Sequence, residues 1–127
     1  MFSHMMIGSN DLDRSKTFYD ATFKAMGGRE GSVDAKGRLV YRHNGSTFLV
    51  TKPIDGEPAT VGNGSTVGFA MTQQQADDWW AAGQNAGGTA VEDPPGVRAA
   101  GTPSAMYLAY LRDPDGNKLC ALNFIGE

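Results

Sequence analysis

The residues whose side chains could most readily take part in chemistry are a histidine near the start of the chain and a cysteine near its end. His4 lies in the apolar stretch 2–8. Because imidazole titrates near neutral pH, His4 is a candidate general acid or base, or a hydrogen-bond donor to a ligand. A structural histidine is the alternative. Cys120 is the single cysteine, and such a residue is more often a small buried hydrophobic side chain than a nucleophile.

Two further candidates lie in a loop and in a turn. Arg98 follows Pro94-Pro95-Gly96 in a loop over residues 93–103. A guanidinium in such a loop can hold a carboxylate or a phosphate, and a solvated arginine is the alternative. His43 ends a predicted strand beside a turn. This favours a surface position, although the same place allows His43 to approach a cavity.

In the first half of the chain, hydrophobic periodicity predicts several short strands and one helix. Apolar side chains at helical spacing from Leu12 to Met26 predict an amphipathic helix. Gly27-Gly28 ends it, because glycine adopts the left-handed conformation common at helix C-termini. Asn44-Gly45 predicts a tight hairpin. The predicted strands of this half are residues 2–8, 29–33, 38–43 and 46–52.

The same order of elements repeats in the second half of the chain. Gly87-Gly88 aligns with Gly27-Gly28, and Asp115-Gly116 aligns with Asn44-Gly45. Each half is therefore a β-α-β-β-β unit, and the loop over 93–103 accounts for the extra length of the second. The predicted elements of this half are a helix over 73–86 and strands over 66–71, 89–91, 105–111 and 118–124.

The repeat predicts an α+β fold. We expect one domain over residues 1–127, with module one at 1–53, a linker at 54–64 and module two at 65–127. A four-stranded unit with one helix leaves one sheet face uncovered. Two such units are therefore expected to form a curled mixed sheet around a cavity, with the helices outside. An ordinary α+β sandwich with accidental internal similarity is the alternative.

Two motifs resemble a known family. His4, the segment 9–15 and Phe18-Tyr19 are similar to the opening of a vicinal oxygen chelate protein, and Asp113-Pro114-Asp115-Gly116-Asn117 after an alternating strand is similar to its closing hairpin. The resemblance to this superfamily of glyoxalases, bleomycin resistance proteins and extradiol dioxygenases covers nearly the whole chain. It implies a homodimer. It also implies a divalent metal held by His or Gln on the first strand of each module and by Glu on the last strand.

The metal-ligand positions of the family are mostly filled by other residue types. His4 matches the first position. Alignment of the two modules places Thr66 at the second position, and Leu49 and Cys120 at the two glutamate positions. Leucine cannot bind a metal, and one histidine with one cysteine is not a recognisable site. We therefore predict no metal site and no cofactor, and a divalent metal is disfavoured.

The resemblance also indicates which side chains line the cavity. Tyr107 and Tyr110 lie three residues apart on a strand and so face opposite sides. Only one of them can face the cavity, and the sequence does not say which. The predicted cavity residues are His4, Leu49, Thr66, Arg98, Tyr107, Tyr110, Cys120 and Leu122.

Composition excludes some classes of partner. The net charge is −3 and the eleven Lys and Arg residues are scattered, which disfavours nucleic acid. No run approaches the roughly 18 apolar residues of a membrane span. A single cysteine excludes an internal disulfide, and a cytoplasmic setting is expected.

The resemblance, together with the residues at the metal-ligand positions, implies a glyoxalase/bleomycin-resistance-like protein that binds a small molecule in a β-sheet cavity without the four-ligand metal site. One alternative is a metal-dependent lyase or isomerase of the glyoxalase type, or a dioxygenase. Another is a metal-independent enzyme that uses His4 as acid or base. The sequence names no ligand and leaves open whether any reaction is catalysed. It also leaves open whether the modules pair within one chain or between two.

Overall fold

The first half of the chain forms a four-stranded mixed sheet, here called sheet A. The computed structural model describes residues 1–126. The strands of sheet A are β1 (His4–Gly8), β2 (Ser32–Val33), β3 (Leu39–His43) and β4 (Ser46–Thr51), in the order β1-β4-β3-β2. β1 is parallel to β4, and the other pairs are antiparallel. The β3–β4 turn has positive φ at Asn44 (49°) and Gly45 (82°), as the hairpin prediction requires.

The second half forms sheet B in the same way. Its strands are β5 (Val67–Ala70), β6 (Thr89–Ala90), β7 (Gly96–Arg98), β8 (Met106–Arg112) and β9 (Lys118–Phe124). The order is β5-β9-β8-β6, and β7 also pairs with β8. Neither sheet closes on itself. The prediction of an α+β fold built from two β-α-β-β-β modules is confirmed.

Each module contributes one helix. α1 (Leu12–Ala25) begins after Asp11, whose carboxylate accepts a hydrogen bond from the Arg14 N–H. α2 (Gln73–Asn85) begins with a capping box between Thr72 and Gln75. Neither helix is long and apolar enough to cross a membrane, and these are the helices of the described residues.

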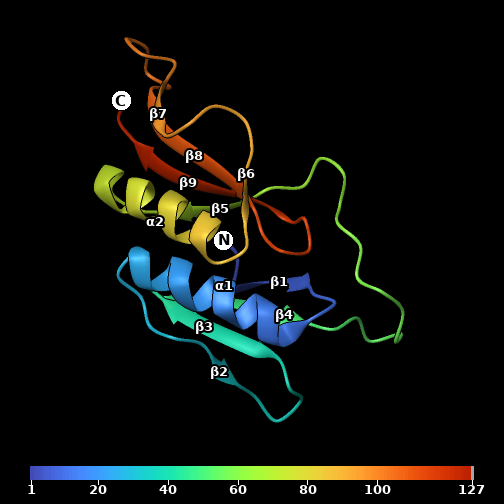
Figure 1. Cartoon of the computed structure of the whole chain (residues 1–127). Coiled ribbons are helices and arrows are strands. Elements are labelled where there is room, and N and C mark those ends of the chain that lie inside the picture. Colours follow the sequence, from blue (N-terminus) through green and yellow to red (C-terminus); the bar gives the residue numbers. More distant parts are fainter. Residues whose placement is uncertain (127) are drawn as a thin grey trace.

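The two helices pack against each other between the two sheets (Figure 1). α1 contacts β3 and β4, whereas α2 contacts β8 and β9. One hydrophobic core joins both helices to the helix-facing sides of both sheets, with Phe18, Tyr19, Trp79 and Leu111 among its members. Each helix thus covers one face of its own sheet. The opposite faces, here called the outer faces, carry no helix.

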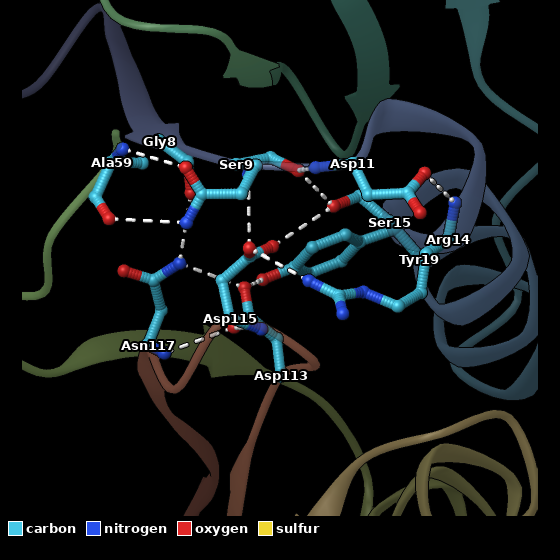
Figure 2. A network of polar contacts seen from close by, with 11 residues as sticks. Gly8, Ser9, Asp11, Arg14, Ser15, Tyr19, Ala59, Asp113, Asp115 and Asn117 are labelled. Carbon is cyan, nitrogen blue, oxygen red and sulfur yellow. Dashed lines mark hydrogen bonds and ion pairs between the residues drawn. The ribbon is translucent and has the colours of Figure 1, made fainter. Parts of the chain in front are cut away.

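A polar network joins the two modules where β1 leads into α1 (Figure 2). The Asn10 N–H and the Arg14 guanidinium both donate to Asp115 Oδ1, at 2.9 Å each. Asn117 Nδ2 donates to the Gly8 carbonyl at 3.1 Å. The turn of the last hairpin is therefore tied to module one, and this contact sets the position of one sheet relative to the other.

One predicted loop is partly wrong. Residues 93–103 were expected to lack regular structure, yet Gly96–Arg98 form β7 against Leu108, Tyr107 and Met106 of β8. The strand forms because it pairs with a distant segment of the chain, and the local Pro-Pro-Gly composition gives no sign of that pairing. Residues 54–64, the predicted linker, contain no strand or helix. The predicted end of module two, residue 127, lies outside the described residues.

Candidate functional site

The outer face of sheet A carries the first group of predicted site residues. Phe48 and Val50 of β4 belong to the hydrophobic core, so Leu49 between them points to the outer face. Leu49 lies beside Met6 of β1, and His4 lies beside Thr47. This face is therefore mainly apolar, with one imidazole at its edge.

The outer face of sheet B carries the second group. Leu119 and Ala121 of β9 belong to the core, which places Cys120 and Leu122 on the outer face. Register fixes their neighbours in two rows across the strands. One row is Gly68, Cys120 and Tyr110, and the next is Ala70, Leu122 and Leu108.

The two candidate tyrosines of β8 face opposite sides. The Tyr107 hydroxyl donates to Asp77 Oδ1 of α2 at 2.6 Å, so Tyr107 lies on the helix side. Tyr110 lies opposite Cys120 on the outer face, with the Lys118 ammonium 4.8 Å from its ring centroid. Tyr110 is therefore part of the outer face, and Tyr107 is not.

Arg98 lies at the end of β7, where it pairs with Met106. Its guanidinium donates to three backbone carbonyls of its own loop, those of Gly96, Asp93 and Pro94, at 3.0, 3.1 and 3.1 Å. The side chain is therefore held in place and is only partly exposed.

Cys120 lies in surroundings that suppress thiolate formation. Its side chain is buried, and this burial raises the pKa of the thiol. Because the thiolate is the nucleophilic form, the arrangement favours a packing role over covalent catalysis.

His4 and Thr66 are the two predicted residues that share a pocket within the chain. This pocket of about 470 Å³ opens between the edges of β1 and β5. Its floor is aromatic: the Phe69 ring lies 5.3 Å from that of Phe48 and 5.6 Å from that of Phe23. The side chain of His4 is exposed, and its Nδ1 makes a 2.8 Å hydrogen bond with Ser3 Oγ.

The sequence did not reveal this pocket. Its lining includes His43, which packs edge-on against Phe23. The signal was present in the alternation of β4 and β5, which places Phe48 and Phe69 on the helix side. The sequence did not indicate that β4 of one module and β5 of the other would bring these two rings together. The other predicted cavity residues, Leu49, Arg98, Tyr107, Tyr110, Cys120 and Leu122, lie outside this pocket.

Comparison with known proteins gives the family. Residues 1–121 match the model of the Glyoxalase/Bleomycin resistance protein/Dioxygenase superfamily. The chain belongs to this superfamily. A crystal structure of a glyoxalase/bleomycin resistance protein from Albidiferax ferrireducens T118 is 53% identical, with a TM-score of 0.88 over 96% of this chain and 97% of that one.

More distant solved structures share the fold. A family enzyme from Burkholderia phytofirmans PsJN is 17% identical, with a TM-score of 0.72 over 97% of this chain and 98% of that chain. Hypothetical protein SA1046 from S. aureus is 19% identical, with a TM-score of 0.71 over 96% of this chain and 92% of that one. No curated protein matches the sequence.

The side chains on the outer faces do not fit the divalent metal of the glyoxalase superfamily. Beside His4, the outward positions of β4 are Thr47, Leu49 and Thr51. If the metal-ligand position of β4 were two residues before or after Leu49, it would be occupied by Thr47 or Thr51, so no carboxylate would lie on this face. In residues 1–126, no three His, Cys, Asp or Glu side chains gather in an arrangement that could hold a metal ion.

Sheet B is equally poor in metal ligands. The outward positions of β9 are Lys118, Cys120, Leu122 and Phe124, and those of β5 are Gly68 and Ala70. Cys120 alone has a donor atom of a suitable kind, and it has no histidine or carboxylate beside it in the register. The two outer faces together offer apolar surface, the imidazole of His4 and the fixed guanidinium of Arg98.

Proposed function

We propose that this chain binds a small, largely apolar molecule in a cavity formed between two copies of itself, without the family's four-ligand metal site. The outer face of sheet A of one copy and that of sheet B of its partner form the walls. The observation that carries the proposal is that Leu49, Leu108, Cys120 and Leu122 lie on sheet faces that no helix of the described chain covers. Apolar, concave and water-excluding walls are typical of ligand sites.

The free strand edges support assembly from two copies. In the described chain β1 and β5 each pair on one side only, with β4 and with β9. An unpaired edge invites another strand. Exposed apolar side chains lie on β1 and just before it, including Phe2 (76% exposed), Met5 (38%) and Met6 (37%). Pairing of β1 with the partner's β5 would join sheet A to a second sheet B and bring their outer faces together.

This assembly also accounts for the in-chain pocket. The pocket between β1 and β5 has an aromatic floor and an apolar rim that includes Phe2, Met5 and Val67. A second copy related by two-fold symmetry presents the same side chains to it. The pocket is then part of the contact between copies, and the ligand cavity lies on the outer faces.

A second candidate function is metal-independent acid or base catalysis by His4. One observation favours it: among the described residues, only Ser3 forms a hydrogen bond with the imidazole, through Nδ1. Nε2 is left available for a proton at the edge of the cavity. Loss of turnover in His4→Ala, with no effect of a chelator, would support this candidate.

Binding of a neutral fluorescent probe tests the cavity. We expect N-phenyl-1-naphthylamine to bind saturably, and Leu122→Arg to weaken binding at least about tenfold because a charge then lies on the apolar wall. The matched control is Ile54→Arg, which adds the same charge to an exposed linker position. Treatment with EDTA should leave the affinity unchanged. Unchanged binding in the Leu122 variant, or loss of binding with EDTA, would contradict the proposal.

A further inference from the structure

Arg98 lies on the face of sheet B that forms one wall of the proposed cavity. β7 pairs Arg98 with Met106 and Gly96 with Leu108. Alternate residues of β8 share a face, and Tyr107, Ala109 and Leu111 pack toward the core. Arg98 therefore lies on the outer face, on the same side of the sheet as Leu108 and Tyr110.

The guanidinium of Arg98 is fixed in position, and among residues 1–126 no carboxylate compensates its charge. Three of its hydrogen bonds go to the carbonyls of Asp93, Pro94 and Gly96. A guanidinium has five N–H donors, so Nε–H and one Nη1–H remain, on different sides of the group, and either can donate to another acceptor. Carbonyls orient the group without neutralising it. No carboxylate forms an ion pair with Arg98 within the described part of the chain.

The neighbouring cations of this face are differently placed. Lys118 forms an ion pair with Glu92. Arg112 donates to the Gly116 carbonyl and lies opposite Lys118, at the far end of β8 from Arg98. Arg98 is thus the one fixed cation, among the described residues of this face, that adjoins the apolar wall and lacks a carboxylate partner.

The wall beside Arg98 suits an apolar group. Leu108 and Leu122 lie opposite each other in the next row of the sheet. Adjacent rows on one face are about 7 Å apart along the strands. Small residues flank this row, because Gly96 lies beside Leu108 and Ala70 beside Leu122. A Cβ added at Gly68, one row further, would meet nothing within 4 Å.

We infer that the ligand of this cavity is a carboxylate on an apolar body, with Arg98 as the anchor of its acidic end. The inference rests on the proposed function and specifies the class of ligand. The carbonyl contacts hold the guanidinium before the ligand arrives, so little side-chain freedom is lost on binding. A carboxylate supplies the negative charge that the loop carbonyls lack, and its oxygen accepts from a guanidinium N–H that those carbonyls leave without a partner. A single fixed cation suits a singly charged carboxylate better than a doubly charged phosphate.

Matched pairs of acids and amides test the anchor. The probes are benzoate and benzamide, 2-naphthoate and 2-naphthamide, and octanoate and octanamide, each titrated calorimetrically at pH 7.5. We expect the wild-type protein to bind at least one acid about tenfold more tightly than its amide, as a charge-assisted hydrogen bond allows. Arg98→Met should remove this preference by weakening the acid alone. Arg112→Met removes the same charge from the far end of the face and should keep the preference.

A purely structural role for Arg98 gives a different result. If the guanidinium only closes the loop, Arg98→Met lowers the unfolding midpoint and weakens acid and amide equally, and this result overturns the anchor. Equal affinity of the wild-type protein for acid and amide also overturns it. Arg98→Lys is a control for disruption of the loop. It keeps the positive charge, so it should retain part of the preference for the acid. Binding of N-phenyl-1-naphthylamine without any acid preference overturns the anchor alone, whereas binding of no probe at all overturns the proposed cavity as well.

Discussion

The carboxylate of Asp113 accepts four hydrogen bonds although its side chain is almost fully buried, at 3% exposure. One donor is the Tyr19 hydroxyl, at 2.6 Å. Burial, with a contribution from Asp113, raises the pKa of Tyr19 well above its usual value, so the phenol remains a neutral donor. We predict that Tyr19→Phe lowers the free energy of unfolding by about 1.5–3 kcal/mol, the usual range for a hydrogen bond to a charged group. Urea denaturation measures this loss.

Tyr107→Phe is the matched control for that measurement. The Tyr107 hydroxyl also donates to a carboxylate at 2.6 Å, but Asp77 is exposed. Solvent replaces an exposed hydrogen bond, so we expect a loss below about 1 kcal/mol. Equal losses for the two variants would show that burial of the Asp113 network contributes nothing.

Cys120 should be almost unreactive in the folded protein. Burial raises the pKa of its thiol, so the thiolate is scarce at pH 7 to 8. Because this is the single cysteine, reaction with Ellman's reagent reports on it alone. We predict a rate at least about 100-fold below that of the protein unfolded in guanidinium chloride. A rate close to that of the unfolded chain would restore Cys120 as a candidate nucleophile.

Residue types alone identified candidate donors and acceptors for the site, but they did not place them relative to one another. Two-residue periodicity places Tyr107 and Tyr110 on opposite faces of β8. Which face is which depends on the side that packs against the core, and that core includes Trp79 of α2, a distant segment. Pro94-Pro95-Gly96 predicted a loop around Arg98, whereas the structure places Arg98 at the end of β7. Its three carbonyl contacts depend on the backbone path of residues 93–98, which composition does not determine.

Among the elements, those with strong local signals were predictable. Helix α1 has apolar spacing and a glycine stop, and the β3–β4 hairpin has Asn44-Gly45. β2 and β7 have two and three residues and are stabilised by pairing with β3 and β8 rather than by their own sequence. Local propensity carries little information for such short strands.

The contact between the helices depends on one glycine. A Cβ added to Gly83 of α2 would overlap Leu111 Cδ1 and lie 3.3 Å from Phe18 Cε1 and from Thr22 Cγ2. We predict that Gly83→Ala destabilises the fold by about 1–3 kcal/mol through overpacking. Helix propensity alone predicts the opposite sign, a gain of about 1 kcal/mol. Thermal unfolding decides between the two effects.

Ala81→Gly provides the comparison for Gly83→Ala. Ala81 is an exposed residue of the same helix, so its replacement changes helix propensity without changing the packing of α2 on α1. A loss of about 1 kcal/mol is expected there. If Gly83→Ala raised the unfolding temperature, close helix packing would not limit this position.

At the scale of the whole molecule, the placement of the modules was beyond sequence reasoning. The internal repeat identifies two similar units, but either arrangement, within one chain or between two, is compatible with it. The structure places both helices between the sheets and leaves the edges of β1 and β5 unpaired within the described chain. Contacts between residues far apart, such as Arg14 with Asp115, hold this arrangement.

Sheet A has two edges, and the proposed assembly uses only one of them. Met5 of β1 and Val33 of β2 are both exposed apolar residues on edge strands, at 38% and 59%. We predict that Met5→Glu converts a dimer to a monomer, or weakens the dimer at least about tenfold, because the interface would bury an unpaired charge. Val33→Glu adds the same charge to the other edge and should leave the dimer intact. Light scattering after size-exclusion chromatography measures both masses. A monomeric wild-type protein, or dissociation by Val33→Glu alone, would remove the between-chain cavity, because the two outer faces lie on opposite sides of the helix pair within one chain.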